Sequence, residues 1–274
     1  MRSDRLTHLE TALKGIAADA GAAILEIYEQ GFDVFSKADD SPLTQADLAS
    51  HRVITAALGM LTPEIPLLSE ESAAVPFAER SQWREYWLID PLDGTKEFIK
   101  RNGEFTVNIA LIREHRPVLG VVHVPVTGVT YSGIVGAGAR RSERGGAPRP
   151  ISVRLPSATP PVIVGSRSHA NPELERYLAP LGDYELVSMG SSLKFCLLAE
   201  GRADFYPRLG PTSEWDTAAA HAVVLAAGGR ITTLEGEPLR YNLKDSLLNP
   251  PFLVIADAGR DWIGLFRPAA GHGA

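Results

Sequence analysis

The segment from Trp87 to Lys96 contains two carboxylates, Asp90 and Asp93, in an arrangement suited to binding a metal ion. They follow an apolar run, and Pro91 and Gly94 favour a turn between and after them, because proline has no N–H for a sheet ladder. Two aspartates and a carbonyl exposed where the strand breaks are the oxygen ligands that a hard divalent cation prefers. The same residues also suit a type I turn in which Asp and Gly serve only the backbone geometry.

The residues that follow favour a site over a plain turn. Thr95, Lys96 and Glu97 supply a hydroxyl, a cation and an anion at the point where a helix is expected to begin. Backbone N–H groups at such a point bind phosphate oxygens. The segment therefore predicts a place where a divalent cation and a phosphate meet.

Three further acidic positions could belong to the same site, and each has a simpler explanation. Glu70 is one of two adjacent acids after the apolar run 65–68, and such acids are most often solvated. Asp47 lies near the start of an expected helix, where it could merely complement the helix dipole. Asp216 completes a Ser-x-x-Asp capping-box pattern. A carboxylate at a helix start can serve both purposes, so these alternatives stay open.

The second half of the chain presents hydroxyls and cations at three expected strand ends. They lie in Gly165–His169, Gly190–Lys194 and Tyr206–Arg208. Each alone is more often a helix cap or a solvated charge. Three such strand ends together suit an anionic ligand at the carboxyl edge of a sheet.

The composition is that of an ordinary globular protein, with 274 residues, 45% hydrophobic and 22% charged. The net charge of −6 gives no basic footprint for a nucleic-acid polymer, so local cations or bound metal must attract an anionic ligand. The single cysteine, Cys196, excludes an intrachain disulfide and fits a reducing compartment. The first residues do not resemble a signal peptide, and no apolar run approaches about 18 residues. We therefore expect a cytoplasmic protein without a transmembrane segment.

Hydrophobic periodicity predicts alternating helices and strands. We expect helices over residues 6–31, 45–61 (with Thr44 as N-cap), 172–181, 192–199 and 214–227. We expect strands over residues 33–37, 65–68, 86–90, 107–113, 118–124, 129–134, 162–165, 185–188, 203–207, 230–233 and 252–255, and a projecting hairpin or loop over 140–161. Such alternation without internal repeats predicts a layered α/β or α+β architecture. No linker separates the halves, so a first part, 1–155, and a second part, 156–274, should share an interface.

Together these segments resemble the inositol monophosphatase superfamily of magnesium-dependent, lithium-sensitive phosphatases. The resemblance covers nearly the whole chain and rests on Glu70-Glu71, Asp90-Pro91-Leu92-Asp93-Gly94-Thr95 and Trp215-Asp216-Thr217-Ala218-Ala219, in the family's order. Within the superfamily the chain is most similar to the CysQ-type 3'(2'),5'-bisphosphate nucleotidases. The segments that carry this similarity are Gly94–Phe98, Gly190–Cys196, Ala199–Asp204, Tyr206–Arg208 and Leu247–Pro250.

The resemblance implies the five-layered αβαβα sandwich of sugar phosphatases, and it assigns roles to the residues above. Two or three Mg²⁺ ions would be ligated by Glu70, Asp90, the Leu92 carbonyl, Asp93 and Asp216. The catalytic residues would be Asp47, Thr95 and Glu70, with Asp47 and Thr95 orienting or deprotonating the attacking water. The substrate would be held by Glu70, Leu92, Asp93, Gly94, Thr95, His169, Ser191, Lys194, Arg208 and Asp216.

The implied activity is hydrolysis of the 3'-phosphate of adenosine 3',5'-bisphosphate to AMP, and of its sulfated analogue, in recycling a by-product of sulfate assimilation. Lys194 with Arg208 favours such a doubly phosphorylated small molecule, because a second phosphate needs cations of its own. Two alternatives stay open: an inositol-1-phosphate or sugar phosphatase, and a catalytically silent scaffold protein. The resemblance allows a homodimer. Peripheral association with the inner membrane also stays open, although nothing basic and amphipathic argues for it.

Overall fold

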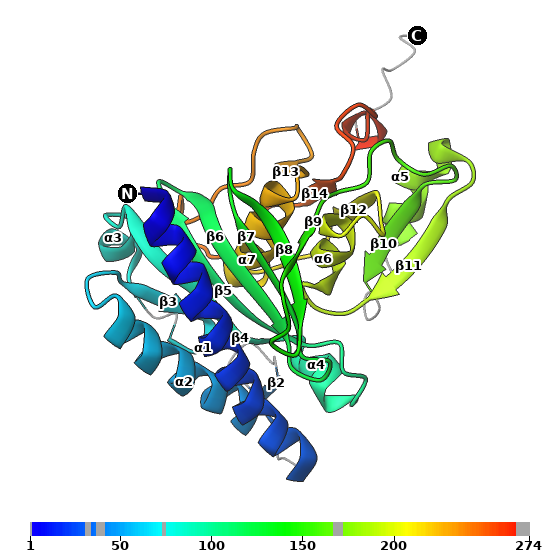
Figure 1. The fold of residues 1–274 in the computed structure, drawn as a ribbon. Coiled ribbons are helices and arrows are strands. Elements are labelled where there is room, and N and C mark those ends of the chain that lie inside the picture. Colours follow the sequence, from blue (N-terminus) through cyan, green and yellow to red (C-terminus); the bar gives the residue numbers. More distant parts are fainter. Residues whose placement is uncertain (1, 31–33, 37–41, 73–74, 167–171, 267–274) are drawn as a thin grey trace.

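Helices and sheets alternate in five layers (Figure 1). The fold is that of a computed structural model, which describes residues 2–30, 34–36, 42–72, 75–166 and 172–266. A pair of helices, a seven-stranded sheet, a second pair of helices, a five-stranded sheet and a last group of short helices follow one another. The predicted αβαβα sandwich is confirmed.

The first pair of helices covers one face of the seven-stranded sheet. It consists of α1 (Arg2–Gln30) and α2 (Gln45–Leu61), which lie side by side (Figure 1). The strand order is β3-β4-β5-β6-β7-β8-β9, and neighbouring strands are antiparallel except for the pair β3 and β4. The strands are β3 (Leu67–Ser69), β4 (Glu85–Asp93), β5 (Thr106–Arg113), β6 (Arg116–Val124), β7 (Val129–Ile134), β8 (Gly138–Glu143) and β9 (Arg149–Ile151).

The central helices, α6 (Leu193–Ala199) and α7 (Glu214–Ala226), separate this sheet from the second one. The second sheet has the order β11-β10-β12-β14-β13, and β10 is parallel to both of its neighbours. Its strands are β10 (Val162–Ser166), β11 (Glu185–Met189), β12 (Phe205–Arg208), β13 (Arg230–Thr233) and β14 (Phe252–Ile255). The outer layer contains α5 (Pro172–Leu178) and the 3₁₀ helices η2 (Ala179–Leu181) and η3 (Ile263–Phe266). The remaining short elements are β1 (Val34–Ser36), β2 (Pro42–Thr44), η1 (Glu70–Ser72), α3 (Phe77–Arg80) and α4 (Thr95–Ile99).

Three hydrophobic clusters hold the layers together. In the first, side chains of α1 such as Leu13 pack against β5 residues such as Ile109. In the second, Val223 of α7 packs among residues of both sheets. In the third, the rings of Phe205 and Trp262 stack with centroids 4.6 Å apart beneath the outer layer. Because both sheets are covered on both faces, their central strands are apolar runs rather than alternating ones.

The element that carries the acidic turn differs from the prediction. We expected the strand to end at Asp90, but β4 continues through Pro91 to Asp93. The register shifts between Asp90 and Asp93, which pair with Asn108 and Thr106 of β5. A proline is tolerated at such a bulge because no ladder hydrogen bond is required of it there. The strand is therefore bent rather than broken.

The hairpin expected over 140–161 is present but does not project. Its strands β8 and β9 extend the seven-stranded sheet at its edge. Arginine side chains fit there because they meet acidic partners: Arg140 lies 3.6 Å from Glu10, and Arg141 lies 3.3 Å from Glu200. The other helices and strands expected from the sequence are present in the described residues, with ends that differ by a few residues.

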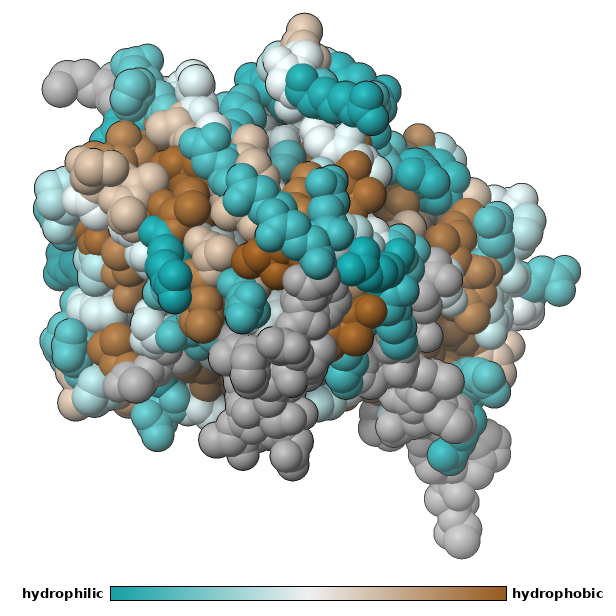
Figure 2. Space-filling model, turned by 90° about the horizontal axis from the view of Figure 1, so that it is seen from below, coloured by the Kyte–Doolittle hydropathy of each residue, from teal (hydrophilic) through white to brown (hydrophobic). Residues whose placement is uncertain are grey.

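The chain passes from the first sheet to the second between Ile151 and Val162. The division into 1–155 and 156–274 falls at this passage and stays a prediction. No helix within the described residues is long and apolar enough to cross a bilayer. Figure 2 views the molecule from below, where hydrophilic and hydrophobic residues are interspersed.

Close packing of α7 on the seven-stranded sheet depends on Gly120 of β6. A Cβ at this position would lie 2.1 Å from the carbonyl oxygen of Ala219. Gly120→Ala should therefore lower the free energy of unfolding by about 1–3 kcal/mol, the usual cost of overpacking. Gly15→Ala is the matched control, since Gly15 is an exposed residue of α1 with no atom within 4 Å of the added Cβ.

In a helix interior, Ala is more favourable than Gly by about 1 kcal/mol, so the control should be slightly more stable than the wild type. Urea unfolding of the three proteins measures both changes. A Gly120→Ala protein as stable as the wild type would contradict the close packing.

Candidate active site

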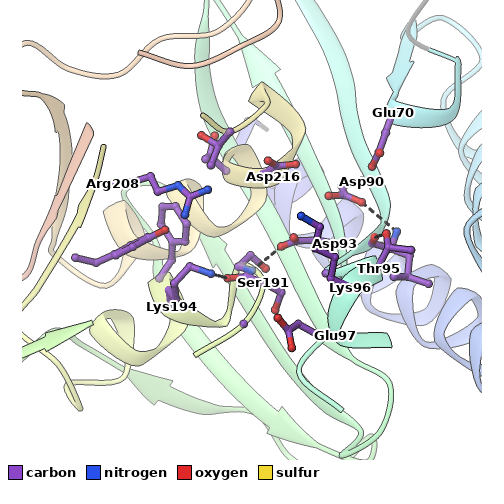
Figure 3. Close-up of a pocket in the computed structure, with 18 residues that line it drawn as sticks. Glu70, Asp90, Asp93, Thr95, Lys96, Glu97, Ser191, Lys194, Arg208 and Asp216 are labelled. Atoms are coloured by element: carbon purple, nitrogen blue, oxygen red, sulfur yellow. Dashed lines mark hydrogen bonds between the residues drawn. The ribbon is translucent and has the colours of Figure 1, made fainter. Parts of the chain in front are cut away.

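A cavity of about 240 Å³ lies where β4, α4, α6, β12 and α7 approach one another. In Figure 3, Glu70 and Asp90 lie on one side of it, and Lys194 and Arg208 lie on the other. The predicted site residues on its wall are Glu70, Asp90, Leu92, Asp93, Gly94, Thr95, Ser191, Lys194, Arg208 and Asp216. The wall also includes Lys96, Glu97, Gly190, Ser192, Phe195, Tyr206, Thr212 and Thr217. The fold thus gathers segments that are far apart in the sequence into one site.

Among the described residues, one predicted member, Asp47, is not on this wall. It reaches the site through Thr95, whose hydroxyl donates to Asp47 Oδ1 over 3.3 Å. His169 lies outside the described residues, so its place in the site stays a prediction.

The bulge of β4 presents Asp90 and the Leu92 carbonyl to the cavity. The Leu92 side chain is buried in the cluster beneath α1 and α2, and the Leu92 N–H donates to Asp90 Oδ1 over 3.0 Å. The Ser50 hydroxyl donates to the Pro91 carbonyl over 2.7 Å, which ties the bulge to α2. Thr95 Oγ1 lies 3.4 Å from the Leu92 carbonyl oxygen. The turn is therefore fixed from both ends.

Asp93 is held through one of its two oxygens. Asp93 Oδ2 accepts from the Ser192 N–H over 2.5 Å and from Asn108 Nδ2 over 3.2 Å, and Thr106 Oγ1 lies 3.4 Å away. The orientation of the carboxylate is set by these contacts. The remaining oxygen, Oδ1, is the one available to a ligand.

Asp47 and Asp216 are both capping residues and members of the site. Asp47 completes the capping box of α2: its Oδ2 accepts from the Thr44 N–H over 2.8 Å and from the Thr44 hydroxyl over 2.7 Å. Asp216 completes the capping box of α7, and its Oδ2 accepts from the Ser213 N–H over 2.8 Å. Asp216 thus caps α7 and also lines the cavity. Asp47 caps α2, and its other oxygen, Oδ1, accepts from the cavity residue Thr95.

Gly94 allows the two halves of the site to approach. Its φ of +92° lies in the left-handed region that favours glycine. A Cβ at Gly94 would also lie 3.2 Å from the Glu104 carbonyl oxygen and 3.2 Å from the Ser191 Cβ. Both the turn after Asp93 and the contact with the Ser191 segment require this glycine.

The cationic side is formed by Lys194 and Arg208. Lys194 is 7% exposed, and its Nζ donates to the carbonyl oxygens of Ser191 and Met189 over 2.5 and 3.5 Å. Burial lowers the pKa of Lys194 to about 8, although the charge of Asp93 opposes this shift. Arg208 donates to the Pro211 carbonyl over 2.9 Å, and within the described residues its buried Nε has no partner. Both cations are therefore held in place by backbone carbonyl groups, and each has a further N–H group that can bind an anion.

Comparison with known proteins identifies the family. The model of the inositol monophosphatase family matches residues 5–259. The chain belongs to the inositol monophosphatase family. The resemblance inferred from the motifs is confirmed.

Members of the family with curated names include close relatives. The chain is 54% identical over 241 residues to the 3'(2'),5'-bisphosphate nucleotidase CysQ of Escherichia coli (strain K12), which covers 87% of this chain and 96% of the relative. It is 37% identical over 263 residues to the protein of the same name from Haemophilus influenzae, which covers 95% and 97%. The crystal structure of CysQ from Bacteroides thetaiotaomicron is 44% identical and superposes with a TM-score of 0.78 over 91% of this chain and 97% of that one.

The electrostatics of the cavity fit a divalent cation. Burial raises the pKa of Asp90 well above its usual range, and the charges of Glu70 and Asp93 raise it further. Burial likewise raises the pKa of Asp216 to about 8, with Asp93 and Glu70 adding to the shift. Within the described residues, no three such side chains converge closely enough to form a closed ligand set. Hard oxygen donors such as these carboxylates are the ligands that Mg²⁺ prefers.

Three buried residues that were not predicted from the sequence support Asp93. Thr106, Asn108 and Ser192 are all buried and bind its carboxylate or one another. Of these residues, Asn108 could have been recognised from the sequence, since it is a polar residue inside the otherwise apolar strand 107–112. A buried amide needs hydrogen-bond partners, so its position alone signals a polar cluster.

Asp216→Asn should stabilise the metal-free protein. It removes one crowded negative charge, while the asparagine side chain can still accept the Ser213 N–H. In a chelator at pH 8 the variant should unfold at a temperature several degrees higher, since about 1 kcal/mol corresponds to about 2–4 °C for a chain of this size. In excess Mg²⁺ the ion should stabilise the wild type more than the variant. The difference between their unfolding temperatures should then shrink or reverse.

The stability difference between Asp216→Asn and the wild type should depend on pH. Folding raises the pKa of the Asp216 carboxyl to about 8, so the protonated carboxyl favours the folded state. This contribution to the free energy of unfolding is complete below the pKa of the unfolded chain and is lost as the pH rises toward about 8. The advantage of Asp216→Asn should therefore be smaller at pH 5 than at pH 8. Scanning calorimetry at the two pH values measures it, and an equal advantage at both would contradict the repulsion.

Proposed function

We propose that this chain is a Mg²⁺-dependent nucleotidase that hydrolyses the 3'-phosphate of adenosine 3',5'-bisphosphate to AMP and phosphate, and that of its 5'-phosphosulfate analogue. The observation that carries the proposal is that one cavity has carboxylates on one side and the cations Lys194 and Arg208 on the other (Figure 3). The named relatives that are 54% identical support the choice of substrate.

The residues that would hold two or three Mg²⁺ ions are Glu70, Asp90, Asp93, Asp216 and the Leu92 carbonyl. When bound, Mg²⁺ would lower the pKa of the attacking water and neutralise the phosphate and leaving-group charges. The carboxylates alone would repel a phosphate monoester, so substrate binding should require the ion. This dependence is the first property to test.

Asp47 and Thr95 would orient the attacking water. The Thr95 hydroxyl donates its proton to Asp47 Oδ1, so a lone pair of Thr95 Oγ1 is available to accept a proton from water. Thr44 holds Asp47 in place through two hydrogen bonds. Thr95 can therefore take the water proton as its own proton passes to Asp47. The N–H groups of Gly94 and Thr95 would hold the scissile phosphate.

Lys194, Arg208 and Ser191 would bind the phosphate that is retained. Lys194 uses two of its three N–H groups on carbonyl oxygens, which leaves one for an anion. Arg208 has a buried Nε without a partner among the described residues. A substrate with one phosphate would leave this pair of cations without an anion, which favours a bisphosphate over inositol 1-phosphate.

Two further parts of the proposal concern the whole molecule. We assign the metal to the first part, 1–155, with Asp216 supplied by the second part, 156–274, which also holds the retained phosphate. Cytoplasm is the compartment we propose, because the single cysteine, Cys196, excludes an intrachain disulfide, which fits a reducing compartment.

A substrate panel tests the proposed function. Phosphate release from adenosine 3',5'-bisphosphate, inositol 1-phosphate, fructose 1,6-bisphosphate and AMP is measured across Mg²⁺ concentrations, with and without lithium. We expect kcat/KM for the nucleotide bisphosphate to exceed the others by about 100-fold, which corresponds to about 3 kcal/mol. Activity should vanish in a chelator.

Two variants sharpen the panel. Asp93→Asn should be inactive on every substrate, and Lys194→Met should raise KM for the nucleotide bisphosphate much more than for inositol 1-phosphate. Dominant activity on inositol 1-phosphate would overturn the choice of substrate. No Mg²⁺-dependent phosphate release from any compound would favour the scaffold alternative.

A further inference from the structure

A buried polar cluster connects the seven-stranded sheet to the start of α6. It consists of Asp93 on β4, Thr106 and Asn108 on β5, and Ser192 before α6. Thr106, Asn108 and Ser192 are 0–1% exposed. Polar groups placed this deep cost stability unless each is hydrogen-bonded, so their arrangement needs an explanation.

The hydrogen bonds of the cluster form a closed ring. Asn108 Nδ2 donates to Asp93 Oδ2 over 3.2 Å, and Asn108 Oδ1 accepts from the Ser192 hydroxyl over 2.9 Å. The Ser192 N–H closes the ring on Asp93 Oδ2. Thr106 Oγ1 lies 2.9 Å from Ser192 Oγ. The amide of Asn108 therefore binds both sides of the site: its Nδ2 contacts Asp93 on β4, and its Oδ1 contacts Ser192 before α6.

The register of the sheet explains why β5 supplies these groups. Asn108 pairs with Asp90 and Thr106 pairs with Asp93, so the two residues flank the bulge of β4. Residues two apart on a strand point to the same face. Both side chains consequently reach the point where β4 presents its second aspartate to α6.

The ring also fixes the residues next to Ser192. Ser191 has a φ of +45°, a left-handed conformation that is uncommon for residues other than glycine. Its carbonyl accepts from Lys194 Nζ, and the neighbouring Gly190 N–H donates to Glu104 Oε2 over 2.7 Å. The turn that carries Ser191 and Lys194 is thus tied to Glu104, just before β5, and to Asp93 at the end of β4.

We propose that Asn108 and Ser192 are positioning residues, which hold Asp93 ready for Mg²⁺ and set the anion-binding turn at a fixed place beside it. Neither residue needs to touch the reacting atoms. With Oδ2 occupied by the ring, Asp93 offers only Oδ1 to the ion, and its side chain does not have to be ordered when the ion arrives. The proposal rests on the proposed function for the identity of the ion.

The test separates positioning from a merely structural role. Asn108→Leu removes both side-chain bonds at similar size, and Ser192→Ala removes the hydroxyl but keeps the N–H bonded to Asp93. Ser132→Ala is the matched control: Ser132 is also 1% exposed and donates to Glu10 Oε1 over 2.7 Å, but it does not line the cavity. Each protein is titrated with Mg²⁺ by calorimetry without substrate, and its Tm is measured in a chelator.

We expect the dissociation constant for Mg²⁺ to rise about 10–100-fold in Asn108→Leu and about tenfold in Ser192→Ala, the range for residues that orient metal ligands. The KM of both variants for adenosine 3',5'-bisphosphate should rise as well. The control should lose stability in the chelator and bind Mg²⁺ as the wild type does. If Asn108→Leu fails to fold, Ser192→Ala carries the test.

Two results with the variants would overturn the proposal. The first is wild-type Mg²⁺ affinity in Ser192→Ala, and the second is an equal loss of affinity in the Ser132→Ala control. A different preferred substrate in the panel would leave the Mg²⁺ titration valid, because the titration uses no substrate. A wild-type protein that binds no Mg²⁺ would contradict the proposed function, and the inference with it.

Discussion

Repulsion among carboxylates in one buried cavity is the constraint on which the rest of the site depends. Burial raises the pKa values of Asp90 and Asp216, and each is raised further by the charges of Glu70 and Asp93. A protein gains nothing in stability from such an arrangement unless a cation joins it. The seven-stranded sheet, η1 and the central helix α7 bring these charges together, and the cations Lys194 and Arg208 lie across the cavity rather than among them.

The aspartates in and beside the cavity share one kind of hydrogen bond, which stabilises their ionised form despite the crowding. Each gives one oxygen to a backbone N–H: Asp47 to that of Thr44, Asp90 to that of Leu92, Asp93 to that of Ser192 and Asp216 to that of Ser213. A hydrogen bond from a backbone N–H favours the ionised carboxylate and fixes its orientation. Asp90, Asp93 and Asp216 also line the cavity, and Asp47 contacts it through Thr95. Two of these contacts are helix capping boxes, so ordinary helix ends also serve to orient functional carboxylates.

The sequence predicts the parts of the site that are local and misses those that are not. The acidic turn, the N-cap residue Thr44, the capping box of Asp216 and the layered fold follow from short-range patterns and periodicity. The bend of β4 at Pro91 does not, because it depends on the register with β5. The contacts of Ser192 with Asp93 and Asn108 join residues 99 and 84 positions apart, and nothing in either segment alone indicates the other. Long-range hydrogen bonds of this kind arise only from the packing of the layers.

The most direct test of the cation site is anomalous diffraction from crystals grown with Mn²⁺, which takes the same oxygen ligands as Mg²⁺. The account predicts strong peaks in the cavity, within bonding distance of Asp90, Asp93 and Asp216 and close to Glu70. The same crystals should show the Asp93 carboxylate still bonded to the Ser192 N–H. Peaks confined to other acidic surfaces, or none in this cavity at saturating Mn²⁺, would contradict the account.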